Sequence, residues 1–195
     1  MSSSATATES PSADLVYTVY EPPAPIPIGP LTLVVSRRGL RAILWSNDTD
    51  GSRDRDRVRW EGAVAGASPL LDAAIEQLDA YFAGTLQKFD LPLDPRGTDF
   101  QVKVWHALAN VPYGETTTYG KQSAELGKPD AIRAVASANG RNPLSIVLPC
   151  HRIIGADGSL TGFAAGLEAK AWLLDHEAKH AHGVPHYQAT PLPGL

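Results

Sequence analysis

The chain has 195 residues, 43% of them hydrophobic and 19% charged, which excludes a collagen-like, coiled-coil or wholly disordered protein and supplies a core for one domain or two small ones. The net charge is −4, and no apolar run approaches the roughly 20 residues of a membrane-spanning helix. The single cysteine, Cys150, excludes an intramolecular disulfide and a multi-cysteine metal site and favours a reducing compartment, for which we expect the cytoplasm.

The first part of the chain predicts a small sheet. Residues 1–13 are rich in Ser, Thr and Ala, and we expect a disordered leader there. Apolar, β-branched runs then predict three strands, the last two joined as a hairpin at Arg38-Gly39. These strands are expected at residues 15–20, 31–36 and 40–45. Alternating Arg and Asp residues at 46–59 predict a solvated loop.

A helix with clear end signals follows the sheet. Ser68 is the expected N-cap, Pro69 the first helical residue and Gly84 the stop. Its apolar side chains recur every three or four residues, at Leu71, Ile75, Leu78 and Phe82. Pro and Gly residues at 92–97 then predict a linker, so we place an N-terminal α/β domain at 14–92.

The second part of the chain predicts a mostly helical domain at 93–180, followed by a tail at 181–195. Helices are expected after a capping box at Thr98–Gln101, at 119–126, at 129–139 and at 167–179. The middle two have helix-turn-helix spacing, a weak signal by itself. Residues 144–149 predict an extended apolar segment that leads into Cys150.

Cys150 has two interpretations. Most lone cysteines are small buried hydrophobes. Here, however, Pro149 stiffens the preceding backbone, and His151 and Arg152 follow directly, where cations favour the nucleophilic thiolate. Successive residues of an extended chain point to opposite sides, so His151 would need a bend or a bridging water to reach the sulfur.

Residues of the last predicted helix bear on the same chemistry. Glu177 follows Leu173 and Leu174 by one helical turn, so it either faces the core and orients His151 or lies exposed at a frayed end. His176 and His180 have metal-ligand spacing, but no third ligand accompanies them. We therefore expect solvent-exposed histidines and no metal.

The predicted helix at 129–139 is rich in small residues, including Ala131 and Ala134, and Arg133 is its only long cation. Residues 101–152 carry six basic and three acidic side chains, which suits contact with a few phosphates. The helix is thus either a packing helix with a surface arginine or one that presses against a DNA groove. The residues alone favour the packing helix.

The stretch from 98 to 177 resembles the O6-alkylguanine-DNA alkyltransferases, also called methylated-DNA–protein-cysteine methyltransferases. Its most specific segment runs from Asn-Pro at 142–143 to Pro-Cys-His-Arg at 149–152. The other matching segments are GTDFQVKVWHAL (97–108), VPYGETTTYG (111–120), AIRAVASANGRNP (131–143) and GLEAKAWLLDHE (166–177). The first half matches more loosely.

The resemblance implies a ribonuclease-H-like α/β domain, with a small antiparallel sheet plus a helix, followed by a mostly α winged-helix-type DNA-binding domain. It implies direct repair of duplex DNA, in which a base flipped from the minor-groove side loses its alkyl group from O6 of guanine, or O4 of thymine, to Cys150. The thioether is inert, so the protein acts once. No cofactor, metal or membrane is expected, and the partner is lesion-containing double-stranded DNA. We expect a monomer, with cooperativity on DNA left open.

The resemblance also assigns the catalytic roles. Cys150 is the alkyl acceptor, His151 takes the thiol proton through a water, and Glu177 holds His151. Asn142 braces the turn before the cysteine.

On the DNA side, the resemblance implies that Tyr119 donates to N3 of guanine and that Arg133, between Ala131 and Ala134, fills the gap left by the flipped base. The carbonyl of Ile153, with that of Cys150, reads the exocyclic amine. The backbone N–H of Ala164 reaches O6.

Three residues depart from the family pattern. Ala165 and Ala136 replace glycines, and Ser145 replaces a frequent proline, so the sequence leaves the preference for lesion size open, more than the reaction itself. Other classes remain open: a binder of alkylated DNA, against which Cys150 argues, a helix-turn-helix regulator, and a cysteine hydrolase with turnover.

Overall fold

The computed structural model describes residues 14–46 and 62–183. The predicted leader, nearly all of the charged loop and the end of the predicted tail lie outside these residues. No helix within them is long and apolar enough to cross a membrane.

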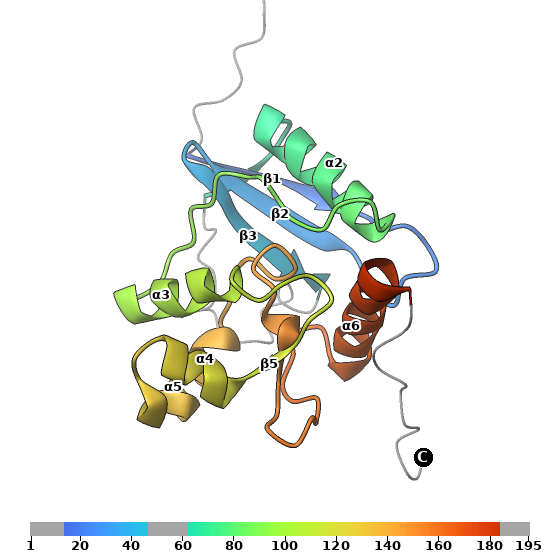
Figure 1. Cartoon of the computed structure of the whole chain (residues 1–195). Helices are drawn as coiled ribbons and strands as arrows, with labels where there is room; N and C mark the ends of the chain where they lie inside the picture. Colours follow the sequence, from blue (N-terminus) through green and yellow to red (C-terminus); the bar gives the residue numbers. More distant parts are fainter. Residues whose placement is uncertain (1–13, 47–61, 184–195) are drawn as a thin grey trace, which may run out of the picture.

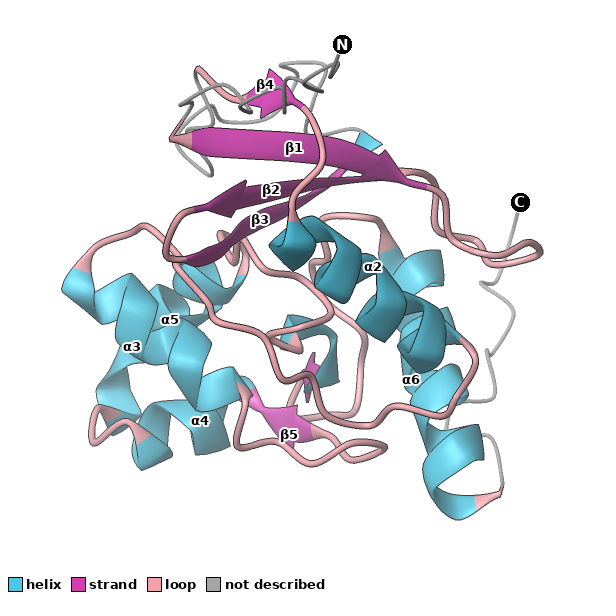
Figure 2. Ribbon diagram, turned by 90° about the horizontal axis from the view of Figure 1, so that it is seen from above, coloured by secondary structure: helices cyan, strands magenta, loops and turns pink. Residues whose placement is uncertain are grey.

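The N-terminal part contains a four-stranded sheet in the order β3-β2-β1-β4. Its strands are β1 (Leu15–Tyr20), β2 (Leu31–Ser36), β3 (Gly39–Trp45) and β4 (Val64–Ala65). The three predicted strands and the hairpin are confirmed, with antiparallel pairing and a bulge at Val34/Val35. The short β4 was not predicted, and it pairs parallel to β1 at the outer edge of the sheet (Figure 2).

Helix α2 (Pro69–Phe82) lies along one face of this sheet (Figure 1). The predicted cap is confirmed, because the Ser68 hydroxyl accepts from the Leu70 N–H at 3.3 Å. The chain leaves the helix through Gly84, whose φ of +76° is a left-handed conformation that favours glycine. The predicted apolar stripe faces the sheet, with Leu71 and Leu78 almost fully buried.

The linker after this domain is bound to the sheet. The N–H of Leu40 donates to the Pro92 carbonyl at 2.8 Å, and the N–H of Asp94 donates to the Leu40 carbonyl at 2.9 Å. The buried Asp94 carboxylate accepts from Ser36 at 2.7 Å and from Arg41 at 2.6 Å. Residues 92–94 therefore extend the edge of β3.

The C-terminal part is mostly helical and of winged-helix type. Its elements are α3 (Asp99–Leu108), β5 (Thr117–Thr118), α4 (Tyr119–Glu125), η1 (Pro129–Ala131), α5 (Ile132–Asn139), η2 (Cys150–Arg152), β6 (Ile153–Ile154) and α6 (Leu167–His182). The predicted capping box is confirmed by two reciprocal bonds between Thr98 and Gln101. The segment that follows α5, orange in Figure 1, lies between the group α3–α5 and helix α6.

The prediction of an extended segment at 144–149 is wrong. The N–H of Leu148 donates to the Leu144 carbonyl at 2.8 Å and closes a turn. Ile146 within it has a φ of +75°, an outlier for a β-branched residue, and its side chain is 1% exposed. Propensity predicts a strand, but the burial of Ile146 and hydrogen bonds from neighbouring residues and from β3 stabilise a turn.

Two predictions for the last helix are also wrong. Helix α6 continues to His182, three residues beyond the expected end. His176 is buried rather than solvent-exposed, since its Nε2 lies 2.8 Å from the Tyr81 carbonyl and its ring stacks on Trp172 at 4.8 Å. His180 is exposed, as expected.

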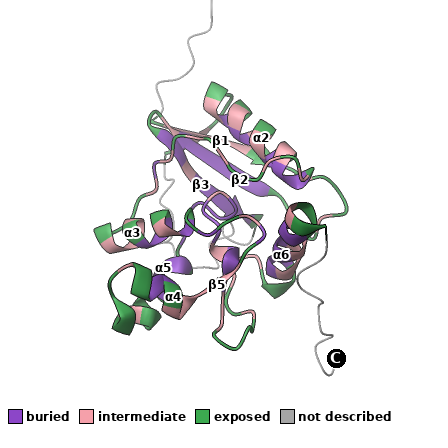
Figure 3. Ribbon diagram, in the orientation of Figure 1, coloured by how far each residue is buried: buried purple, intermediate pink, exposed green. Residues whose placement is uncertain are grey.

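One hydrophobic core spans both parts of the chain. It contains Leu33 and Tyr81 from the N-terminal part together with Trp105, Leu144 and Leu173 from the C-terminal part. Figure 3 shows the buried residues gathered between the sheet, α2 and α6, with exposed surfaces on α4 and α5. The loop that leads into Cys150 is thus anchored in the core of the whole molecule.

Candidate active site

Cys150 begins η2 and is half-buried. The turn before it is braced by Asn142, whose Nδ2 donates to the Leu148 carbonyl at 2.6 Å and whose Oδ1 accepts from the Leu144 N–H at 3.0 Å. The N–H of Ile43 on β3 donates to the Pro143 carbonyl at 2.8 Å. The cysteine therefore stands on a fixed loop.

Two adjoining hollows lie beside Cys150. The inner one, of about 10 Å³, is lined by Cys150, Ser145, Tyr119, Asn139, Gly140, Gly162, Phe163 and Ala164. The outer one, of about 420 Å³, is lined by Tyr119, Ala136, Gly140, Thr161, Gly162, Phe163 and Ala164. Two of the three departures from the family pattern, Ser145 and Ala136, thus face the hollows that lead to the sulfur.

His151 and Glu177 form a buried pair. Nε2 of His151 lies 2.8 Å from Oε1 of Glu177, and neither side chain has any exposed surface. With Nε2–H donated to the carboxylate, Nδ1 of His151 is a buried acceptor without a hydrogen-bond partner among the described residues. The tight turn of η2 replaces the extended geometry that separated His151 from the sulfur in our prediction.

The protonation states suit this pair. Burial lowers the pKa of His151, and the charges of Arg152 and Lys170 lower it further, against an opposing effect of Glu177. Burial alone would raise the pKa of Glu177, but the charges and hydrogen bonds of His151 and Arg152 outweigh it and hold the pKa well below its ordinary value. A neutral imidazole thus faces an ionised carboxylate.

Glu177 accepts from several further donors. They are Nε and Nη2 of Arg152 at 2.8 and 3.0 Å, the hydroxyl of Tyr81 at 2.8 Å and the N–H of Gly114 at 3.3 Å. Arg152 also donates to the Val111 carbonyl at 2.6 Å. Glu177 therefore faces the core, which settles the alternative that the sequence left open.

Lys170 is a buried residue of the site that sequence reasoning missed. Its Nζ donates to the Ile153 carbonyl at 2.6 Å and to the Thr161 carbonyl at 2.9 Å, which ties together the two segments flanking the hollows. Burial lowers its pKa to about 8. Its position two helical turns before Glu177, on the same face of α6, is the signal that was available.

Tyr119 begins α4 at the rim of both hollows, and its hydroxyl accepts from Oγ1 of Thr161 at 3.3 Å. The N–H of Ile153 donates back to the Cys150 carbonyl. The Ile153 carbonyl is already bonded to Lys170, although a carbonyl oxygen can accept a second bond. Ala164 lines both hollows.

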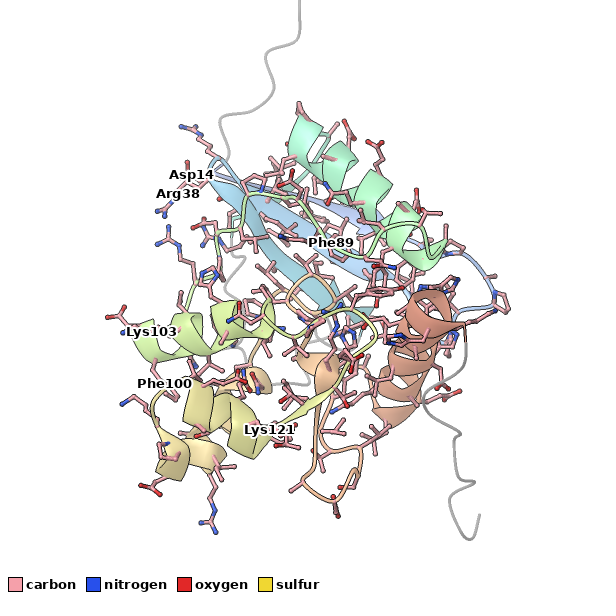
Figure 4. All side chains as sticks on the ribbon, viewed as in Figure 1. Asp14, Arg38, Phe89, Phe100, Lys103 and Lys121 are labelled. Atoms are coloured by element: carbon pink, nitrogen blue, oxygen red, sulfur yellow. The ribbon has the colours of Figure 1, made fainter. Side chains whose placement is uncertain are left out.

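Helix α5 has one packed and one open face. Val135 and Ala138 are buried, whereas Arg133 and Ala134 are exposed and Ala131 is half-exposed. The open face carries mostly short side chains, and Lys103 and Lys121 project from α3 and α4 in the same half of the molecule (Figure 4). This is the geometry of a helix that can approach another surface closely.

The site contains no metal-ligand cluster within the described residues, where no three His, Cys, Asp or Glu side chains gather.

The fold and the site together combine a half-buried cysteine, directly followed by a buried histidine that is paired with a glutamate, with a mostly helical domain of winged-helix type. Residues 15–95 match the ribonuclease-like domain, and residues 99–179 the DNA-binding domain, of 6-O-methylguanine DNA methyltransferase. The chain belongs to the O6-methylguanine DNA methyltransferase family.

Individual proteins that are similar to this chain support the same family. A methylated-DNA–protein-cysteine methyltransferase of Methanosarcina barkeri is 46% identical over 151 residues, which are 77% of this chain and 92% of the relative. That of Mycobacterium tuberculosis is 46% identical over 158 residues, 80% of this chain and 90% of the relative. The crystal structure of Mycobacterium tuberculosis OGT in complex with DNA superposes with a TM-score of 0.73 at 40% identity, covering 88% of this chain and 96% of that one.

Proposed function

We propose that this chain repairs DNA by moving the alkyl group of O6-alkylguanine to the sulfur of Cys150, in one irreversible step per protein molecule. The observation that carries this proposal is a buried His151, which directly follows the half-buried Cys150 and is bonded to the buried Glu177. Nδ1 of His151 remains available to accept a proton. The exposed, small-residue face of helix α5, whose Ala136 lines the outer hollow, supports DNA rather than a small metabolite as the substrate.

The chemistry requires a thiolate. The thiol proton of Cys150 passes, through a water, to Nδ1 of His151, and the resulting imidazolium is stabilised by Glu177. The thiolate then attacks the sp³ carbon of the alkyl group. A C–S bond forms, the C–O6 bond breaks, and the electron pair leaves with guanine, which takes a proton at N3 from Tyr119.

The substrate must leave the stack first. An alkyl group on O6 lies inside the duplex, so the nucleotide is turned out into the hollows beside Cys150. Arg133, flanked by Ala131 and Ala134, enters from the minor groove and fills the gap, which offsets part of the few kcal/mol that flipping costs. The carbonyls of Cys150 and Ile153 and the N–H of Ala164 then contact the base edge. The same pocket accommodates O4-alkylthymine.

Intact mass spectrometry tests this proposal. After mixing with a duplex oligonucleotide that contains one O6-methylguanine, the protein should gain the mass of one CH₂, and a peptide map should place it on Cys150. Cys150→Ala should bind the same duplex and gain nothing. Binding without any mass gain in the wild-type protein would identify a recognition protein, and mass gain in Cys150→Ala would exclude the assigned acceptor.

A further inference from the structure

The carboxylate of Glu177 is also held by the N-terminal domain. Tyr81, next to last in α2, is fully buried, and its hydroxyl donates to Oε1 of Glu177 at 2.8 Å. The carbonyl of the same residue lies 2.8 Å from Nε2 of His176. Tyr81 thus contacts two consecutive residues of α6, one through its side chain and one through its backbone.

The Tyr81 hydroxyl shares its acceptor atom with the catalytic base. Oε1 of Glu177 also lies 2.8 Å from Nε2 of His151 and 3.0 Å from Nη2 of Arg152. Burial and the Glu177 carboxylate raise the pKa of Tyr81 well above its ordinary value, so the hydroxyl keeps its proton and remains a donor. Each donor on Oε1 disperses its charge and weakens its pull on the proton of His151.

Other charged and titratable groups face this pair. Tyr113 and His176 interact electrostatically with Glu177, and Lys170 interacts with His151. Arg152 lies between Glu177 and the ring of Tyr113, 5.6 Å from its centroid. These groups all belong to the C-terminal domain. Among the described residues, Tyr81 is the donor to Glu177 that comes from the N-terminal domain.

We propose that Tyr81 is a positioning residue for methyl transfer, through which the ribonuclease-like domain completes the active site. Its hydroxyl fixes Oε1 of Glu177 and shares its negative charge, so that His151 stays neutral and correctly oriented to accept the thiol proton. The proposal rests on the proposed roles of Cys150, His151 and Glu177.

The test uses Tyr81→Phe in the full chain. Cys150 is the only cysteine, so the rate of its alkylation by iodoacetamide reports the site without DNA. Without the tyrosine hydroxyl, Glu177 holds the proton of His151 more strongly, and the base stays protonated to higher pH. The pH of half-maximal alkylation should therefore rise by about half a unit or more. Single-turnover methyl transfer should also slow by about tenfold, because His151 is no longer held in the orientation that accepts the thiol proton.

Tyr20→Phe is the matched control. The Tyr20 hydroxyl donates to Asp79 on the same helix at 2.7 Å, so this variant loses the same kind of bond away from the site. Because Asp79 is exposed, this variant should lower the melting temperature less than Tyr81→Phe, and it should leave the pH profile unchanged. As a second variant, 3-fluorotyrosine at position 81 keeps the shape of the ring with a stronger donor, and it should shift the midpoint down.

The outcomes are distinct. A Tyr81→Phe profile that coincides with that of Tyr20→Phe, or an unmoved midpoint for the fluorinated protein, overturns the role of Tyr81 while methyl transfer by the wild-type protein still stands. Absence of methyl transfer in the wild-type protein instead rejects the proposed function.

Discussion

At the scale of single residues, the site depends on one carboxylate that serves several partners. Glu177 is fully buried and is bonded to His151, Arg152, Tyr81 and Gly114. A buried carboxylate is tolerated only when it is paired in this way. Glu177 therefore compensates the buried charge of Arg152, and in the proposed mechanism it also orients His151 as the base.

Acid should weaken the fold through this pair. The folded-state pKa of His151 lies below its ordinary value of 6.5, so the unfolded chain binds more protons and stability falls as the pH drops below 6.5. The folded-state pKa of Glu177 lies below its ordinary value of 4.5, so a second loss begins there. Glu177→Gln should be less stable at pH 7 by about 3 kcal/mol, because Arg152 is left unpaired. Below pH 4.5, however, its free energy of unfolding should depend less on pH than that of the wild-type protein.

Urea unfolding at stepped pH values measures this. The exposed Glu76→Gln on α2 is the control and should follow the wild-type curve. If the plots of unfolding free energy against pH for Glu177→Gln and the wild-type protein run parallel below pH 4.5, titration of Glu177 does not contribute to the loss of stability in acid.

At the scale of elements, the loop before Cys150 shows where sequence reasoning failed. The ends of α2 and α3 were predicted because their signals are local: Ser68 and Gly84 for α2, and the Thr98–Gln101 box for α3. The turn at 144–148 is instead held by the Asn142 side chain and by β3, and it places Ile146 against its own propensity. The bonds of Asn142 are local but irregular, and the bond from β3 is long-range, so neither leaves a periodic pattern in the sequence.

The same limit explains which site residues were predicted. The sequence alone shows that His151 follows Cys150 and that Glu177 lies on the leucine face of α6. Tyr81 and Lys170 were missed because their contacts with the site form only in the folded chain. Tyr81 bonds to Glu177 on α6, and Lys170 bonds to the carbonyls of Ile153 and Thr161.

The bonds of Asn142 in the turn before Cys150 predict a loss of stability when they are removed. Asn142→Ala removes two buried hydrogen bonds and leaves the Leu148 carbonyl and the Leu144 N–H without them, so the free energy of unfolding should fall by about 2–4 kcal/mol. Chemical denaturation measures the loss. Asn110→Ala, at an exposed position after α3, should change stability by less than about 0.5 kcal/mol. Equal losses in the two variants would contradict a bracing role.

The exposed Arg133 on helix α5 gives a prediction for methyl transfer from duplex DNA. Arg133→Ala should lower the rate of methyl transfer from duplex DNA by tenfold or more, about 1.4 kcal/mol, because the flipped state loses the side chain that fills its gap. Alkylation of Cys150 by iodoacetamide should not change. The control is Lys88→Ala, an exposed cation of the N-terminal domain. An equal effect of both substitutions on transfer would point to general electrostatic attraction instead.

At the scale of the whole molecule, hydrogen bonds and a shared core join the two domains, and we predict that they unfold as one cooperative unit. The linker pairs with β3, Ile43 bonds to Pro143, Tyr81 bonds to Glu177, and one core contains residues of both domains. The N-terminal domain therefore supports the loop that carries Cys150 and the carboxylate of Glu177.

Calorimetry tests this cooperativity. The full chain should unfold in one transition, and Asp94→Ala should lower the stability of the whole by about 3 kcal/mol, because Arg41 loses its buried partner. Arg38→Ala, which removes an exposed arginine 3.6 Å from Asp94, should cost about 0.5 kcal/mol. Two separate transitions, with only one shifted by Asp94→Ala, would show independent domains.

The proposed reaction consumes the sulfur of Cys150, so each protein molecule can repair one lesion. Titrating a fixed amount of protein with an excess of duplex that contains O6-methylguanine, and counting the repaired duplexes, measures this directly. We predict a plateau at one repaired duplex per protein molecule, with every Cys150 methylated at the plateau. Continued repair beyond one equivalent, or a plateau with unmodified Cys150, would contradict it.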